Sequence, residues 1–330
     1  MPGKILPTLL LTAFCLLVLL GSSFLGMTII SPASILETGS PDAEVFWRLR
    51  LPRSIAAFFA GAALAVSGMV FQAMFRNPLA TPFTLGVSSG AALGASLAIM
   101  LGLSTALPGI PAGLCAALLG CLLSMLLVCG ITRARGGFST PVMLLAGVII
   151  NFFFSSLVMF IQYWSDARDA LQIMRWLMGS LSGLEPVHIA DLGMITAMGS
   201  LLLSRFTREL DLLLAGKELA ASRGVAVQRV TLTAFALASL MVAAVVSLAG
   251  PIGFVGMMAP HICRLWLGAG HERLLPASFV MGGCFLVLCD LLSRSVLAPA
   301  ELPIGIITAM IGGPFFLWTL FKSNRNSEML

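Results

Sequence analysis

Apolar residues fill most of the chain in ten runs that polar segments separate. The runs cover residues 5–30, 54–75, 83–102, 112–131, 141–163, 187–203, 230–249, 252–268, 277–296 and 303–321. A helix needs about 20 apolar residues to cross a bilayer, so the pattern predicts about ten transmembrane helices, several of them short or broken. The first run is too long for a secretory signal and many spans follow it, so it is interpreted as the first span.

The basic residues predict the orientation of these spans, because cytoplasmic loops are enriched in Lys and Arg. If the N-terminus is inside, thirteen basic residues fall on the inner side and six on the outer side. The outer set is Arg48, Arg50, Arg53, Arg168, Arg175 and Arg294. The asymmetry predicts that both termini are cytoplasmic.

Composition agrees with an integral membrane protein. Of 330 residues, 58% are hydrophobic and 10% charged, whereas a soluble domain is nearer a quarter charged. Long apolar runs favour helices over the short alternating segments of a β-barrel. The net charge of +5 comes from residues that flank the spans, so no nucleic-acid partner is expected. The seven cysteines have no C-x-x-C spacing and are interpreted as packing residues, and no metal site is predicted.

Residues 204–229 form the longest polar stretch of the chain. Charged residues are interleaved there with leucines, and Gly216 and Gly224 bracket a short helical piece. A surface helix with an apolar stripe needs a surface to pack on. Spacing alone leaves two interpretations open: a loop folded against its own membrane domain, or a helix that docks on a soluble partner.

The two halves of the chain resemble each other weakly. A turn at 77–82 follows the second span and precedes a Gly/Ser/Ala-rich helix, and a turn at 250–256 follows the seventh span and precedes a short helix broken near Pro260. Spans 2–5 (about 50–163) would then match spans 7–10 (about 229–321), with the second copy entering from the opposite side. Gly/Pro-interrupted segments in inverted repeats point to a transport path.

Specific motifs occur in both halves. The first half reads RLPR at 50–53, GAALAVSGMVFQ at 61–72, RNPLATP at 76–82 and LGV at 85–87. The second half reads AGPIGFVG at 249–256, PHICR at 260–264, ELPIG at 301–305 and IGGPFF at 311–316. Over about residues 45–320 the chain resembles the permease subunits of ABC importers for ferric siderophores, haem and vitamin B12, the FecCD-type family.

This resemblance implies an all-α polytopic membrane protein with the type II ABC importer permease fold, built as a single transmembrane permease domain over residues 1–330. It implies that the permease lies in a bacterial inner membrane and pairs with a second, identical permease subunit. Its other expected partners are two cytoplasmic ATPase subunits and a periplasmic or extracellular substrate-binding protein. The chain has no G-x-x-x-x-G-K-[ST] phosphate-binding motif. ATP and Mg²⁺ are therefore expected on the partner ATPase, and this chain is expected to be no enzyme, to hold no cofactor and to contact membrane lipid.

The resemblance also implies which residues contact the ATPase. The coupling residues within segment 204–229 are Leu214, Gly216, Lys217, Glu218, Leu219, Ala220, Arg223 and Gly224. Leu214, Leu219 and Ala220 are expected to pack into a cleft of the ATPase, and the charged residues to fix the orientation at its rim.

Docking of the binding protein is expected at Arg48, Arg50, Arg53 and Arg294, although cations that flank a span also serve as headgroup anchors. Asp290 and Arg294 are four residues apart and are expected to pair within one helix while Arg294 still points outward.

Ser139 and Thr140 open the fifth span on the inner side. In the resembled family this place is a constriction of the translocation path, so both residues are gate candidates. The other interpretation is a simple helix cap, since Ser and Thr are favoured there.

The predicted function is ATP-driven import of a metal chelate, with a ferric siderophore as the first expectation and haem or cobalamin as further options. An ion-coupled secondary transporter is the alternative, because inverted repeats occur there too. That class would need a network of intramembrane acids, and only Asp290 and Asp191 approach the membrane interior. A non-transporting scaffold is disfavoured by the Gly/Pro-broken helices.

Overall fold

The structure is a computed structural model that describes residues 5–327 except 27, 29, 37–39, 108–109 and 136–139, and leaves out the side chains of 5–12, 36, 106–110, 320 and 322–327. The α-helices of its first half are α1 (Ile5–Phe24), α2 (Pro41–Glu44), α3 (Leu51–Phe75), α4 (Val87–Met100), α5 (Ala112–Ala134), α6 (Thr140–Trp164) and α7 (Ala167–Leu177). Those of its second half are α8 (Pro186–Ser204), α9 (Thr207–Ala215), α10 (Lys217–Ser222), α11 (Val227–Ala249), α12 (Val255–Leu267), α13 (His271–Ser295) and α14 (Ile304–Ser327).

Smaller elements complete the chain. They are the 3-10 turns η2 (Ser34–Leu36) and η4 (Pro82–Leu85), the π-helical stretch η3 (Val45–Arg50), and the antiparallel strands β1 (Thr105–Leu107) and β2 (Ile110–Pro111). The π stretch joins α2 to α3, so one continuous helical run covers Pro41–Phe75, part of which the sequence predicts to be a polar connection.

The ten predicted spans each correspond to one helix. Within the described residues, six helical segments are long and apolar enough to cross a membrane, and three further apolar helices are shorter. The tenth is α12, which has 13 residues and Pro260 inside it. The prediction of about ten spans, some short or broken, is confirmed.

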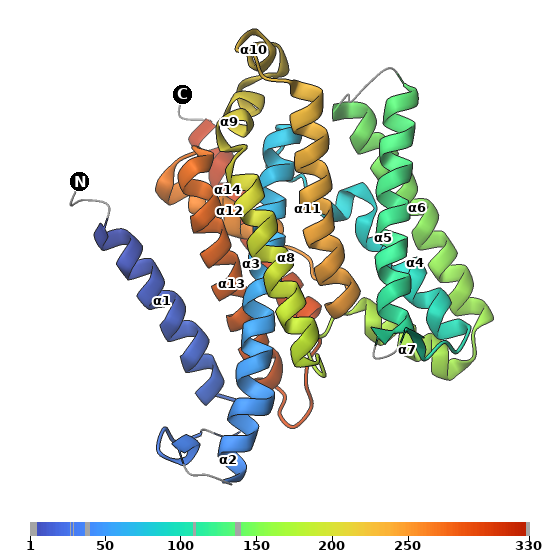
Figure 1. Ribbon diagram of the computed structural model, residues 1–330, viewed down its shortest axis with the longest axis vertical. Coiled ribbons are helices and arrows are strands. Elements are labelled where there is room, and N and C mark those ends of the chain that lie inside the picture. Colours follow the sequence, from blue (N-terminus) through green and yellow to red (C-terminus); the bar gives the residue numbers. More distant parts are fainter. Residues whose placement is uncertain are drawn as a thin grey trace.

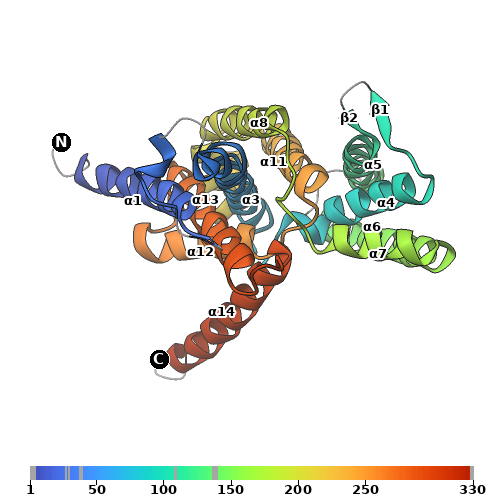
Figure 2. The same cartoon turned by 90° about the horizontal axis from the view of Figure 1, so that it is seen from below.

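Helix α3 forms the centre of the bundle (Figures 1 and 2), and almost all of its residues from Ala56 onward are buried. It packs against α8, α11, α12 and α13. The contacts are close because small residues meet: a Cβ atom added to Gly61 would lie 2.2 Å from the Gly282 carbonyl oxygen, and one added to Gly68 would lie 1.8 Å from that of Gly256. Such approaches let helices gain van der Waals contact in a membrane, where apolar burial drives association less.

The two halves run in opposite directions through the bundle. Helix α3 starts at the end of the molecule where α2 lies, the α2 end, and α11 starts at the opposite end, where α10 lies, the α10 end (Figure 1). Each long helix is followed by a turn and a short helix, α4 after Gly86 (φ 77°) and α12 after Phe254 (φ 67°). Spans 2–5 and 7–10 thus form the inverted repeat that the sequence predicts.

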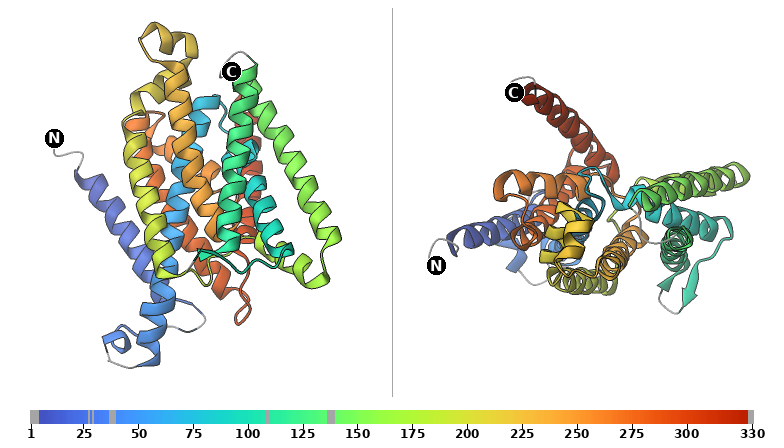
Figure 3. Two further views of the ribbon diagram at one scale, coloured as in Figure 1. Left: turned by 45° about the vertical axis from the view of Figure 1, so that its right-hand side comes forward. Right: turned by 90° about the horizontal axis from the view of Figure 1, so that it is seen from above.

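Two helices lie at the periphery of the bundle (Figure 2). Helix α14 leaves the bundle and projects outward (Figure 2; Figure 3, right). Helix α7 lies at the α2 end beside α4 and α6. The sequence predicts a polar connection at residues 164–186 without α7, because an 11-residue amphipathic helix is too short to resemble a span.

Candidate functional site

The polar segment 204–229 folds into two short helices at one tip of the molecule (Figure 1). Helix α9 ends at Ala215 and α10 begins at Lys217, so Gly216 is the only residue between them. Gly216 has φ 149° and ψ 143°, a backbone conformation that a residue with a side chain rarely adopts. The predicted helical piece between Gly216 and Gly224 is confirmed as α10.

The α9 helix is fixed to the centre of the bundle at two places. Arg76, which follows α3, donates from Nε to the Leu214 carbonyl oxygen at 3.1 Å. Asp211 accepts at Oδ1 from the backbone N–H of His271, the first residue of α13, at 3.0 Å, and the His271 ring Nδ1 lies 2.5 Å from the same oxygen. These contacts fix α9 to the end of α3 and to the start of α13. The sequence gives no signal for these links, because the partners are far apart along the chain.

The coupling residues divide into an outer and an inner face. Leu219 is 45% exposed, and Glu218, Arg223 and Gly224 are exposed beside it. Ala220 is fully buried in the hydrophobic core of this chain, so the expectation that it packs into a partner is wrong. The buried face of α10 thus folds against its own membrane domain, and docking of the exposed face on a partner stays a prediction.

The remaining coupling residues, Leu214 and Lys217, are half-buried. Partial burial lowers the pKa of the Lys217 ammonium group by desolvation. Lys217 directly follows Gly216 and Leu214 lies two residues before it, so both residues sit near the junction of α9 and α10.

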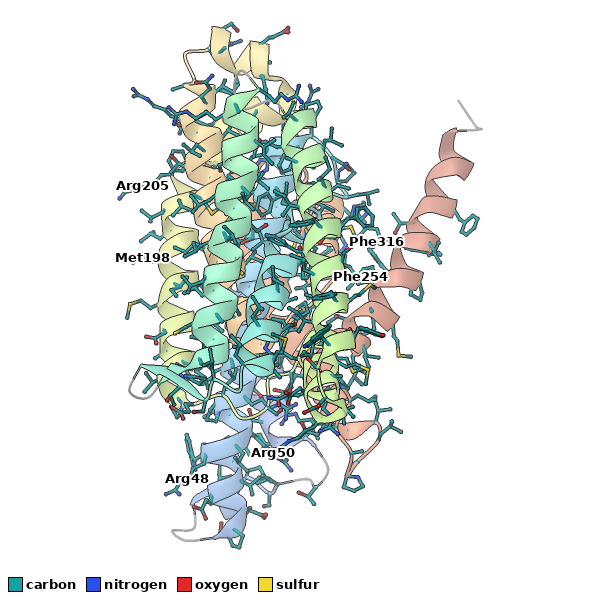
Figure 4. All side chains as sticks on the ribbon, turned by 90° about the vertical axis from the view of Figure 1, so that its right-hand side faces the viewer. Arg48, Arg50, Met198, Arg205, Phe254 and Phe316 are labelled. Atoms are coloured by element: carbon teal, nitrogen blue, oxygen red, sulfur yellow. The ribbon has the colours of Figure 1, made fainter. Side chains whose placement is uncertain are left out.

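Arg50 lies inside the α2 end of the bundle (Figure 4). Its guanidinium donates to the Phe24 carbonyl oxygen at 3.1 Å and to Thr28 Oγ1 at 3.0 Å. Phe24 is the last residue of α1, so the cation meets the carbonyl end of that helix, where positive charge is favourable. Arg50 is buried and holds α1 against α3.

Arg53 and Arg294 share one buried carboxylate. Asp290 is fully buried; its Oδ1 accepts from Arg53 Nε at 2.7 Å, and its Oδ2 lies 3.3 Å from Arg294 Nε. Arg53 also pairs with Glu301 at 2.8 Å, and Arg294 donates to the Ser22 carbonyl oxygen at 2.9 Å. The predicted pair of Asp290 and Arg294 is confirmed, but the expectation that Arg294 points outward is wrong.

Of the four arginines predicted to dock a binding protein, only Arg48 projects away from the bundle (Figure 4). Its side chain is 77% exposed and pairs with Glu44 at 2.7 Å. Arg50, Arg53 and Arg294 are engaged within the fold, so in this structure they are not free to meet a soluble partner. Sequence cannot separate these cases, because an arginine that flanks a span looks the same whether it faces water or a buried acid.

The two gate candidates lie where α6 begins. Thr140 is its first residue and is half-buried, and Ser139 lies outside the described residues. This start of α6 is near the α10 end, at the opposite end from α2 (Figure 1).

An apolar groove of about 560 Å³ runs between α14 and the turn that precedes α12. Its lining includes Met178, Phe254, Gly305, Ala309 and Met310. The start of α14 is held in place there, because the N–H of Gly305 donates to the Met178 carbonyl oxygen at 3.2 Å. Spans eight (252–268) and ten (303–321) both contribute to this groove. Phe254 lies on the side that faces α14 (Figure 4).

Within the described part of the chain, no group of three or more His, Cys, Asp or Glu residues is placed to hold a metal ion. His261 packs against the rings of Phe315 and Phe316, with centroids 6.0 Å apart in both pairs, which agrees with its interpretation as a structural residue.

Comparison with known proteins assigns this arrangement to a class. The profile of the FecCD transport family matches residues 9–322. The haemin transport system permease protein HmuU of Yersinia pestis is 36% identical over 98% of this chain and 99% of its own length. The vitamin B12 import system permease protein BtuC of Escherichia coli O157:H7 is 39% identical over 96% of this chain and 95% of its own length.

Solved structures agree with the fold. A structure described as an inward-facing metal-chelate type ABC transporter superposes with a TM-score of 0.85 at 32% identity and covers 96% of this chain and 99% of its own. PsaBC from Streptococcus pneumoniae, in complex with Fab, has a TM-score of 0.54 at 14% identity, over 83% of this chain and 92% of its own, which supports the fold alone.

The inverted repeat of broken helices around α3 defines a polytopic membrane permease. The chain belongs to the FecCD transport family. It is a permease subunit of an ABC importer and leaves ATP hydrolysis to separate ATPase partners.

Proposed function

We propose that this chain forms, with a second identical copy, the membrane part of a binding-protein-dependent importer of a metal chelate in a bacterial inner membrane. The α10 end would face the cytoplasm. Two features support this orientation: basic residues are enriched in the segments assigned to that side, and the polar helices α9 and α10 lie there.

The observation that carries the proposal is the construction of α9 and α10. The exposed face of α10 presents Leu219 between Glu218 and Arg223, an apolar contact with a charged rim. The segment behind it is fixed through Arg76 and Asp211 to α3 and α13. Motion of two ATPase subunits in contact with α10 would therefore reach the helices at the centre of the bundle.

The second subunit would cover α14. This helix projects from the bundle, and its side chains Met310, Leu317 and Phe321 are exposed. The groove between α14 and Phe254 opens on the same side and has an apolar lining with few functional groups. A path formed between two such faces would be smooth, which suits a large cargo that must enter and leave without tight binding. Thr140, at the start of α6, is the proposed inner gate.

We propose a tetrapyrrole chelate as the cargo. The named relatives transport haem and vitamin B12, both of which are metal-bearing macrocycles of this class. The iron siderophore that the sequence analysis puts first has no counterpart among these relatives, so it becomes the alternative that a cargo experiment must separate.

Docking of the binding protein is proposed at Arg48, the exposed member of the predicted arginine set. Ion pairs at the rim of an interface govern the rate of encounter more than the final affinity. Arg53 and Arg294 would contribute only by holding the surrounding surface in shape.

A secondary transporter is less well supported. Such a protein needs an acid that exchanges ions, but the buried carboxylate of Asp290 lies between Arg53 and Arg294. That carboxylate is already engaged by the two guanidinium groups, so it is not free to bind a transported ion.

The test is purification of the complex from cells that express the chain with the ATPase and binding protein encoded beside it. Mass spectrometry of the bound cargo should detect a tetrapyrrole chelate, and proteoliposomes should accumulate it only when ATP and both partners are present. Uptake driven by an ion gradient without ATP would refute the proposal, and a bound siderophore would refute the assignment of the cargo.

A further inference from the structure

Phe254 is held in a backbone conformation that an aromatic residue rarely adopts. Its φ is 67° and its ψ is −32°, in the left-handed half of backbone space. For a bulky side chain this region is strained, and residues that persist there cluster at functional sites and switch regions. A glycine at this position would be free of the strain. The chain carries a phenyl ring instead, so the ring itself calls for an explanation.

The ring rests on a glycine of α14. A Cβ atom added to Gly312 would lie 2.3 Å from Cγ and 2.4 Å from Cδ1 of Phe254, whereas one added to Gly313 would meet no atom within 4 Å. Gly312 is buried and Phe254 is half-buried, so α14 covers one part of the ring and leaves another part open. A side chain at position 312 would push the ring off this seat.

The ring also lines the apolar groove beside α14. Every described residue of that lining is apolar, including Met178, Pro251 and Met310. Phe254 lies near mid-height of the molecule, on the side that faces α14 (Figure 4). The ring is therefore placed between the two ends of the bundle, away from Thr140 at the α10 end.

Helix α14 is weakened next to the seat of the ring. Pro314 has no N–H, so the Met310 carbonyl oxygen lacks its helical hydrogen bond, and two glycines directly precede this proline. Sharp bends in helices occur at such positions. The start of α14 is fixed, because the N–H of Ile304 donates to the Gly179 carbonyl oxygen at 3.2 Å, whereas the helix beyond it projects from the bundle (Figure 2). A bend at this proline would move the seat relative to the ring.

We propose that Phe254 is a gate residue of the translocation path and that movement of α14 opens and closes it. The strained backbone holds the ring in the groove while Gly312 supports it, and loss of this support lets Phe254 relax to negative φ and withdraw the ring. An aromatic ring closes a path by steric contact and offers the cargo no polar group to bind. The inference rests on the proposed path between two copies of the chain. It adds to Thr140 a second gate at another depth, so that the path can be closed from one side at a time.

A simple packing role makes a different prediction. If the ring of Phe254 only filled space between α12 and α14, the ring of Phe316 would do the same work. Phe316 contacts His261 of α12 with ring centroids 6.0 Å apart, and it does not line the groove. Phe316→Ala is therefore the matched control for Phe254→Ala, because each variant removes one phenyl ring from the contact between the same two helices.

The experiment uses the complete importer, the permease with its ATPase and binding protein, in proteoliposomes that enclose calcein. Release of the dye is measured without nucleotide and with a non-hydrolysable ATP analogue. The wild type and Phe316→Ala should retain the dye in both states. Phe254→Ala should release it at least roughly tenfold faster than the wild type in one state only, because the inner gate still closes the path in the other.

A second pair of variants displaces the ring without removing it. Gly312→Ala and Gly313→Ala each add one methyl group to the same turn of α14, but only the first meets Phe254. Gly312→Ala should leak in the same state as Phe254→Ala, and Gly313→Ala should retain the dye. The double variant of Gly312→Ala and Phe254→Ala should leak no more than either single variant, since both changes act through one ring.

Three outcomes would overturn the gate: release by Phe254→Ala in neither state, release in both states, or equal release by Gly312→Ala and Gly313→Ala. Release in both states would mean that the bundle is disrupted rather than opened. A wild-type complex that hydrolyses ATP but imports no tetrapyrrole would refute the proposed function instead.

Discussion

Replacement of Asp290 by Asn tests how the α2 end of the bundle is held together. The substitution preserves the shape of the side chain and removes the negative charge that Arg53 and Arg294 share. Arg53 retains Glu301 as a partner, whereas Arg294 is left with hydrogen bonds to the Ser22 carbonyl oxygen and to Ser54. Arg294 is then a buried cation without a counter-ion.

The magnitude follows from the burial of these groups. Removing one partner of a buried ion pair costs about 3–5 kcal/mol, because the remaining charge stays buried and unpaired. With an unfolding entropy of about 2.1 cal/mol/K per residue, a loss of 1 kcal/mol lowers the melting temperature of a chain of 330 residues by about 1.4 °C. Asp290→Asn should therefore lower the melting temperature by roughly 4–7 °C.

The assay is thermal unfolding of the purified protein in detergent, followed by intrinsic tryptophan fluorescence. Glu301→Gln is the matched control, because it removes the other acid that pairs with Arg53 but is 47% exposed. Exposed ion pairs contribute about 0.2–1 kcal/mol, so this control should melt within about 1.5 °C of the wild type. If Asp290→Asn melted no lower than Glu301→Gln, the buried carboxylate would not be what holds the two arginines.

Three further predictions follow from the packing, the gate and the docking surface. Gly68→Ala should destabilise the protein by about 1–3 kcal/mol, because its Cβ would lie 1.8 Å from the Gly256 carbonyl oxygen. Gly130→Ala is the control and should melt like the wild type, because no atom lies within 4 Å of the added Cβ. Equal melting of the two variants would contradict the close packing. Thr140→Cys, with the seven native cysteines removed, should form an intersubunit disulfide that blocks uptake, because the two copies of a gate residue would face each other across the path. Bridging requires the two Cα atoms to lie within about 7 Å, so the yield should vary with ATP as the gate opens and closes. A variant that never crosslinks would remove Thr140 from the gate. Arg48→Glu should slow association of the binding protein, with an effect that shrinks as salt is added; an unchanged rate at low salt would leave Arg48 as a headgroup anchor.

Sequence predicts the spans well because each needs a long apolar run, and every run became one helix, even the short α12. It also locates the interruptions, since the turns at 77–82 and 250–256 are rich in Pro and Gly. These features are local, so a pattern along the chain is enough to find them.

Contacts between distant residues could not be predicted in this way. Arg53 and Asp290 are 237 positions apart, and Arg76 bonds to a backbone carbonyl, which has no sequence signature. Burial of a single residue was equally hidden: Leu219 and Ala220 are neighbours of similar apolar character, yet one is exposed and the other fully buried. Which face of α10 is free depends on the packing of α9 against the bundle.

The central claim is that the exposed face of α10 receives the motion of the ATPase subunits. The most direct measurement compares ATP-driven uptake by proteoliposomes that contain the permease, its ATPase and its binding protein, with the permease as wild type, Glu218→Arg or Glu272→Arg. Glu218 is exposed on α10 and Glu272 is an exposed acid at the start of α13, so both variants make the same change of charge. We expect Glu218→Arg to express and fold normally but to lose uptake by at least roughly tenfold, as expected for the loss of an interface contact worth more than about 1.4 kcal/mol, while Glu272→Arg retains uptake. Normal uptake by Glu218→Arg would contradict the assignment of α10 as the site of energy input.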